Sequence, residues 1–90
     1  MTLDQNALDR LNERAGRIGT DIGWELEVSK SPAGNHFGVQ ASDSEDGNFV
    51  LGPVSEDTAE REIESLLDRL EAGTTVILRD DEGTVRAVDR

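Results

Sequence analysis

Few residues of this chain have the type and spacing that catalysis or metal binding requires. His36 is the only histidine and there is no cysteine, so thiolate metal sites, cysteine nucleophiles and disulfides are excluded. A serine triad through His36 lacks the G-x-S-x-G spacing of a nucleophile elbow. We therefore expect His36 to be an exposed strand residue, and we predict a protein that is not an enzyme and has no cofactor or metal.

The acidic segment before Gly47 has a superficial likeness to a calcium loop. If Gly47 took the sixth position of such a loop, Ser42 would be the first residue and Pro53 the twelfth. Calcium loops require Asp and Glu at these two positions. We therefore interpret the segment as a solvated turn.

The charge balance limits the partners that the protein can have. Twenty acidic residues face nine basic ones, Lys30 is the only lysine, and the formal net charge is −11. Such a charge repels nucleic acid and anionic membranes. Three explanations stay open: adaptation to high salt in a halophile, acidic drift of the surface in a GC-rich genome, or an acidic surface made for a basic protein partner. No apolar stretch is long enough to span a membrane and no signal peptide is visible, so we expect a cytoplasmic protein.

Hydrophobic periodicity predicts seven elements in the order α-β-β-β-α-β-β. Helical spacing predicts one helix over 3–18, with a Thr2–Gln5 capping box and Gly19 as C-cap, and a second between Ser55 and Gly73. Alternation predicts strands at 22–29, 37–41 and 48–51, the last ended by Gly52-Pro53, with a turn at 31–35 and a polar loop at 42–47. A terminal hairpin is expected at 74–79 and 84–88, with Gly83 at positive φ.

Short connections favour antiparallel pairing, and each helix has one apolar stripe to bury. We predict a single α+β domain over 1–90, a two-layer sandwich with a mostly antiparallel sheet and two helices packed on one face. Trp24, Phe37 and Phe49 are in phase with the apolar faces of their strands. We expect all three in the core, because buried aromatics dominate small cores.

The outer face of such a sheet would mix aliphatic and charged residues. A face of this kind can be self-complementary in a homodimer. Our first hypothesis is therefore a small, acidic, non-catalytic interaction or structural protein that self-associates. The residues expected on the association face are Val50, Ile77, Arg79, Arg86 and Val88.

The second helix carries a run of carboxylates with like-charge neighbours four residues apart. Glu60–Glu64 and Glu64–Asp68 are such pairs, and each costs a few tenths of a kcal/mol in dilute salt. Either screening by salt or a cationic partner would relieve the repulsion. The alternative hypothesis is therefore an acidic inhibitor or mimic that binds a basic surface of a nucleic-acid-binding protein. Its face would consist of Glu56, Asp57, Glu60, Glu64 and Asp68.

The α-β-β-β-α order resembles the double-stranded-RNA-binding domain over about two-thirds of the chain. That family contacts phosphates through basic residues at the start of its second helix. The corresponding stretch here, 56–61, reads Glu-Asp-Thr-Ala-Glu-Arg and is acidic. The resemblance therefore concerns the order of elements and does not imply RNA binding.

Overall fold

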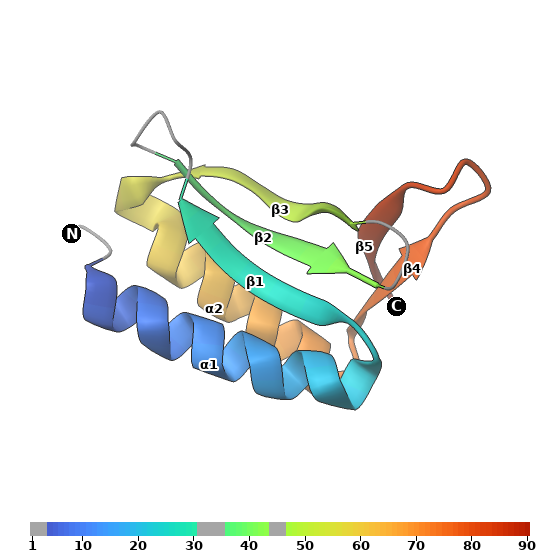
Figure 1. The fold of residues 1–90 in the computed structure, drawn as a ribbon, viewed down its shortest axis with the longest axis horizontal. Helices are drawn as coiled ribbons and strands as arrows, with labels where there is room; N and C mark the ends of the chain where they lie inside the picture. Colours follow the sequence, from blue (N-terminus) through green and yellow to red (C-terminus); the bar gives the residue numbers. More distant parts are fainter. Residues whose placement is uncertain (1–3, 31–35, 44–46) are drawn as a thin grey trace.

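The computed structural model describes residues 4–30, 36–43 and 47–90, so Thr2, the turn predicted at 31–35 and part of the loop at 42–47 lie outside the described residues. Seven elements follow one another in the predicted order (Figure 1). They are α1 (Gln5–Ile22), β1 (Glu25–Lys30), β2 (His36–Ser42), β3 (Gly47–Ser55), α2 (Glu56–Ala72), β4 (Thr75–Arg79) and β5 (Val85–Asp89).

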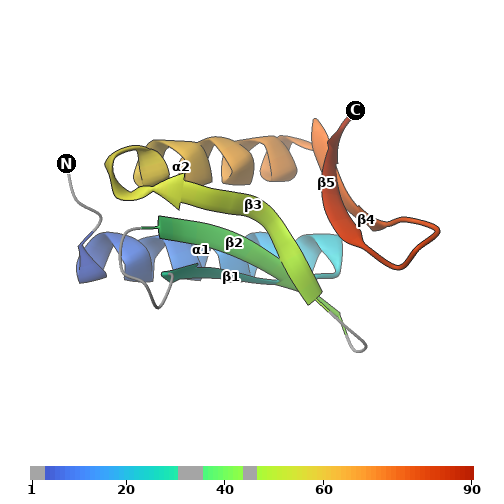
Figure 2. The same ribbon diagram turned by 90° about the horizontal axis from the view of Figure 1, so that it is seen from above.

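The predicted two-layer α+β arrangement is confirmed. β1, β2 and β3 form an antiparallel sheet in that order, and α1 and α2 lie side by side on one of its faces (Figures 1 and 2). β4 and β5 form a separate two-stranded sheet, which stands beyond one end of the helices (Figure 2). The strands are therefore divided between two antiparallel sheets, and the other face of β1-β2-β3 is left without a covering layer.

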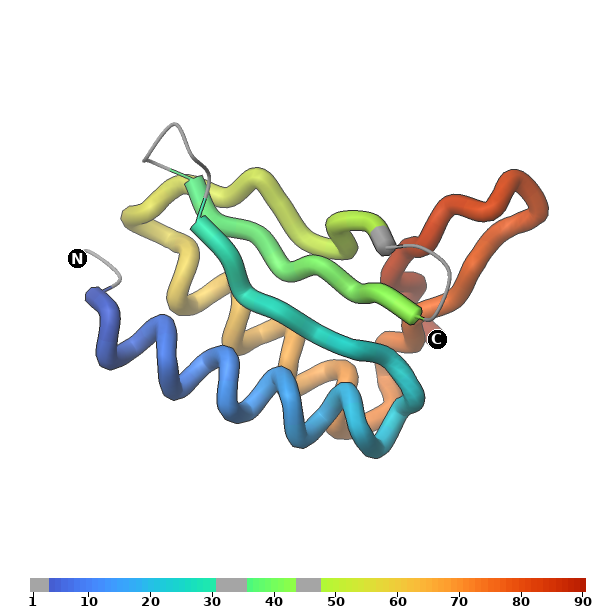
Figure 3. Tube along the Cα trace, viewed as in Figure 1, coloured from blue at the N-terminus to red at the C-terminus, as the bar shows by residue number. Residues whose placement is uncertain are grey.

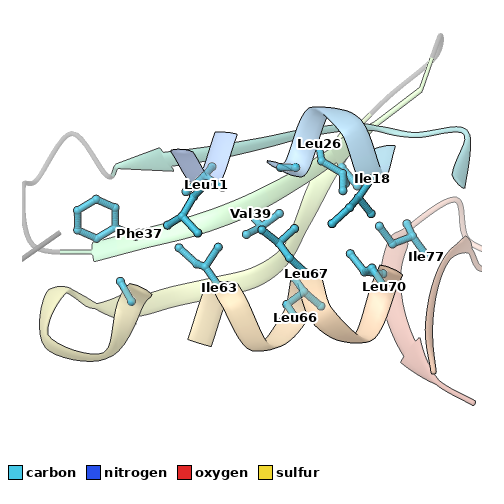
Figure 4. Close-up of a cluster of buried hydrophobic side chains, with 14 of the residues drawn as sticks. Leu11, Ile18, Leu26, Phe37, Val39, Ile63, Leu66, Leu67, Leu70 and Ile77 are labelled. Atoms are coloured by element: carbon cyan, nitrogen blue, oxygen red, sulfur yellow. The ribbon is translucent and has the colours of Figure 1, made fainter. Parts of the chain in front are cut away.

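The core lies between the sheet and the two helices, where both apolar stripes meet (Figure 4). The predicted stripe of α2 is buried throughout, and Leu67 and Ile63 have no exposed surface. Phe37 is 2% exposed and takes its predicted place. Trp24 is half-buried and packs against the edge of the core. The buried members of the α2 stripe are Ala59, Ile63, Leu66, Leu67 and Leu70.

The first helix is longer than predicted, and Gly19 is not its C-cap. α1 begins after Asp4, whose side chain accepts a hydrogen bond from the Ala7 amide, and ends at Gly23, with φ of 84°. Gly19 is buried within the helix because the chain folds back against it. The Trp24 amide donates to the Gly19 carbonyl at 2.9 Å, and a Cβ on Gly19 would lie 2.2 Å from the Trp24 carbonyl oxygen.

The third strand also departs from prediction, because it runs through Gly52-Pro53 to Ser55. Phe49, which we expected in the core, is 59% exposed. Val39 pairs with Leu51 whereas the next residue of β2, Gln40, pairs with Phe49. One extra residue of β3 therefore sits at this point. Side chains alternate with a period of two, so such a bulge turns the following residue to the opposite face.

A side chain of the first helix bonds to the backbone at the outer edge of β1, and the helix runs alongside that strand (Figure 3). The side-chain amide of Asn12 donates to the Val28 carbonyl at 3.0 Å, and its oxygen accepts from the Val28 amide at 2.7 Å. Asn12 thus occupies both backbone groups that a further strand would use at Val28. Covering an edge in this way prevents pairing with other chains.

Two glycines of α1 give a matched test of this packing. We expect Gly19→Ala to destabilise the protein by about 1–3 kcal/mol, because the new methyl group would overlap the backbone of Trp24. Gly16 has nothing within 4 Å of an added Cβ, so Gly16→Ala should stabilise by about 0.5–1 kcal/mol through helix propensity. Urea unfolding followed by circular dichroism measures both, and equal effects would contradict the described turn.

Candidate interaction surfaces

The terminal hairpin has one buried face and one exposed face. Cross-strand pairing places Ile77 opposite Ala87 and Leu78 opposite Arg86, so these two pairs point to opposite sides. The buried side contributes Ile77 and Val85 to the core. The exposed side carries two of the large hydrophobic residues that remain accessible, Leu78 at 43% and Val88 at 37%. We call this exposed side the hairpin patch; it consists of Val76, Leu78, Arg86 and Val88.

The five residues predicted for self-association do not share one face. Ile77 is 8% exposed and belongs to the core, and Val50 is half-buried against the core at the bulge of β3. Arg79 is half-buried, donating to the Asp43 carboxylate at 2.6 Å. Arg86 and Val88 lie together on the hairpin patch, whereas Ile77 and Arg79 lie on the opposite face of the hairpin.

Leu78 and Val76 were not predicted for this face, because the expected face combined Ile77 and Arg79 of β4 with Arg86 and Val88 of β5, which point to opposite sides. The Asp80 amide donates to the Thr84 carbonyl at 2.9 Å, and this bond sets the register that pairs Leu78 with Arg86. Counting residues outward from the Asp80–Thr84 loop along both strands pairs Leu78 with Arg86 and Val76 with Val88, and this count predicts the patch.

The hairpin turn is held by the carboxylate of Asp80. One of its oxygens accepts the backbone amides of Glu82 and Thr84, each at 2.9 Å, and the other accepts from Arg86 at 2.7 Å. The hydrogen bond from the Thr84 amide is the largest cause that holds the pKa of Asp80 below its usual value. The Glu82 amide and the Arg86 guanidinium lower this pKa further. The turn also draws the Arg86 guanidinium toward Asp80.

The acidic residues predicted for a basic partner lie along α2, where α1 partly neutralises them. Arg14 donates to Asp68 at 2.5 Å and to Glu71 at 3.3 Å. The hydrogen bond that Arg14 donates to the Asp68 carboxylate is the largest cause that raises the pKa of Arg14. Glu60 and Glu64 line a surface groove between the helices. The arginines of α1 in this groove are Arg10, Arg14 and Arg17.

The remaining two residues of the predicted acidic face have a structural role. Glu56 and Asp57 form the acidic first turn of α2, where negative charge stabilises a helix by about 0.3–1 kcal/mol through its dipole. The five carboxylates therefore follow one helix as predicted, but the fold itself provides positive charge for several of them. The Arg14–Asp68 bond offsets part of the repulsion between Glu64 and Asp68.

The described part of the chain offers few groups for chemistry. Within it, no three His, Asp or Glu side chains gather as metal ligands would, and Thr75 is the one buried polar residue in 4–30, 36–43 and 47–90. None of the described helices has the length and apolar character needed to cross a membrane. Any binding function among the described residues would therefore depend on exposed side chains.

No protein-family model, curated protein or solved structure matches this chain. A function must therefore be argued from its own surfaces.

The Asp80 turn predicts a specific pH dependence. Because its folded pKa lies below the ordinary value of 3.8, Asp80 stabilises the hairpin above that value, and the stabilisation is lost as pH falls through the folded pKa. We expect NMR titration of the Asp80 carboxyl group to give a pKa below its ordinary value of 3.8. We also expect Asp80→Asn, but not Asp81→Asn, to lower the unfolding temperature at neutral pH. If Asp80 titrates at or above its ordinary value, or if both variants unfold at the same temperature, the bonds described for this turn are wrong.

Proposed function

We propose that this is a small, non-catalytic interaction protein that self-associates through the hairpin patch. One observation carries the proposal. In a chain with twenty acidic residues and a net charge of −11, the patch contains three aliphatic side chains, one arginine and no carboxylate. Two copies of an acidic chain repel each other least where the surface is apolar and has no carboxylates.

A second copy suits the patch because a two-fold contact brings the same residues together from both sides. Leu78 and Val88 of one copy would lie against the aliphatic side chains of the other. Arg86 is drawn toward Asp80 by a 2.7 Å hydrogen bond, which favours exposure of the aliphatic strip. A standard interface buries about 800 Å² per partner, and four residues provide less, so we expect a weak dimer.

Pairing through the outer edge of β1 is a less favourable route to a dimer. At β1, the hydrogen bonds of Asn12 occupy the backbone of Val28, and α1 runs alongside that strand. Strand addition there would require α1 to move. Packing of the hairpin patches requires no rearrangement of the fold.

The alternative of an acidic mimic receives less support. A mimic needs carboxylates that are available to a basic partner, whereas Asp68 is bonded to Arg14 and Glu60 and Glu64 lie in a groove with three arginines. Salt separates the two functions. Higher salt screens the repulsion between two acidic copies and strengthens an apolar dimer, but it weakens binding to a basic protein.

The proposal predicts a dimer whose affinity rises with salt and depends on Leu78. Sedimentation velocity over a range of protein and potassium chloride concentrations measures this. We expect Leu78→Glu to weaken the dimer by about tenfold or more, because it places a carboxylate at the centre of the apolar patch. Thr84→Glu adds the same charge at the exposed hairpin loop, and it should weaken the dimer far less.

Two results would overturn the proposal. One is a monomer at every salt concentration and at high protein concentration. The other is a dimer that Leu78→Glu and Thr84→Glu affect equally, since charge alone would then explain the change.

A further inference from the structure

The face of the three-stranded sheet that points away from the helices has no covering layer (Figure 2). Leu26 and Val28 of β1 are buried against the helices, so Glu25 and Glu27, which alternate with them, point to this other face. The outward positions of β1 and β2 include these two glutamates but no lysine or arginine, and β3 has no charged residue. The face is therefore acidic.

An exposed aromatic ring stands on the same face. Val39 and Ala41 of β2 are fully buried, so Gln40 between them points outward, and its partner on β3 is Phe49. Directly paired residues have their side chains on the same side of a sheet. At 59%, Phe49 is the most exposed large hydrophobic residue in the described part of the chain. We call this surface the outer sheet face; it includes Glu25, Glu27, Gln40 and Phe49.

The ring of Phe49 is held in place by Gly38. A Cβ on Gly38 would lie 2.9 Å from Cδ1 and 3.1 Å from Cε1 of Phe49, so the ring packs against bare backbone of β2. This contact fixes the ring while more than half of its surface stays exposed to solvent. A side chain that is already fixed loses little conformational entropy when a partner binds.

A carboxylate, an amide and an aromatic ring form one row across the outer sheet face. Glu27 pairs with Gln40, and Gln40 pairs with Phe49. Adjacent strands lie about 4.8 Å apart, so the row spans about 10 Å from Glu27 to Phe49. Glu25 lies two residues from Glu27 on the same strand. Among the salt bridges of the described residues, none involves either glutamate, so both carboxylates are available to an external cation.

We propose that the outer sheet face binds an arginine-containing basic segment of another protein. A guanidinium group has the two properties that the row recognises, because it pairs with carboxylates and its planar surface stacks on an aromatic ring. The ammonium of lysine is a compact, strongly hydrated charge and stacks less well. The net charge of −11 attracts a basic partner over a longer range.

A second copy of this chain is a less suitable occupant of the outer sheet face. The carboxylates of Glu25 and Glu27 repel an acidic chain, whereas the hairpin patch has no carboxylate. The acidic helix α2 is also a less suitable site for a basic partner, because arginines of α1 share a groove with its glutamates. The inference is thus independent of the proposed dimer, and salt should weaken this binding although it strengthens the dimer.

The probe is the peptide acetyl-Gly-Arg-Gly-Arg-Gly-amide, and the control is the same peptide with lysine in place of both arginines. Its two arginines are two residues apart, as are Glu25 and Glu27. In an amide NMR titration at low salt, we expect the arginine peptide to bind with a Kd of about 1 mM. The largest shifts should fall on Glu27, Gln40 and Phe49. The lysine peptide should bind about fivefold more weakly.

Matched variants separate recognition from net charge. Phe49→Leu keeps an apolar side chain over Gly38 but removes the aromatic surface, so it should weaken binding of the arginine peptide by about fivefold and equalise the two peptides. Glu27→Gln should weaken both peptides by about fivefold. Glu62→Gln removes the same charge from the exposed surface of α2 and should change either Kd by less than about twofold. All three residues are exposed, so circular dichroism should show that the variants fold.

Several results would overturn the inference. They are the absence of saturable binding, shifts centred on α2, and equal affinity of the unmodified protein for the two peptides. Retention of the original Kd in both Phe49→Leu and Glu27→Gln would also contradict it. So would equal effects of Glu27→Gln and Glu62→Gln, since net charge alone would then explain the binding.

Discussion

The two hydrogen bonds between Asn12 and the backbone of Val28 join the helical layer to the edge of the sheet. They fix α1 against β1. Because Gly19 has no side chain, the backbone of Trp24 can pack directly against α1 where the chain turns back into β1. This packing orients the apolar stripe of α1 toward α2 and the sheet. It also occupies the edge of β1 at Val28, while the hairpin patch and the other face of the sheet have no covering layer.

Patterns of period 3.6 predicted the helices well, because each stripe buries a whole face and Gly73 ends α2 as expected. Patterns of period two predicted which strands exist, but not always which side chains face outward. In β3 an extra residue separates the phases of Leu51 and Phe49, and nothing local in the sequence marks it. The close approach of Gly38 and Gly52 could not have been predicted either, since it joins residues of two different strands.

Some of the carboxylates behind the net charge of −11 make contacts within the fold. Arginines of α1 lie in one groove with carboxylates of α2, and the Asp80 carboxylate organises the hairpin turn. Part of the acidity is therefore used within the fold. The surface proposed for self-association lacks carboxylates: the hairpin patch has Arg86 and three aliphatic side chains.

The most direct test of this account is a dilution series followed by two-dimensional NMR of amide and methyl groups at constant high salt. It reports which atoms sense a second copy. The account predicts that the methyl signals of Val76, Leu78 and Val88 move with concentration while the amides of 25–30 stay in place, because α1 covers that edge. Concentration-dependent shifts centred on β1, or none at any position, would contradict it.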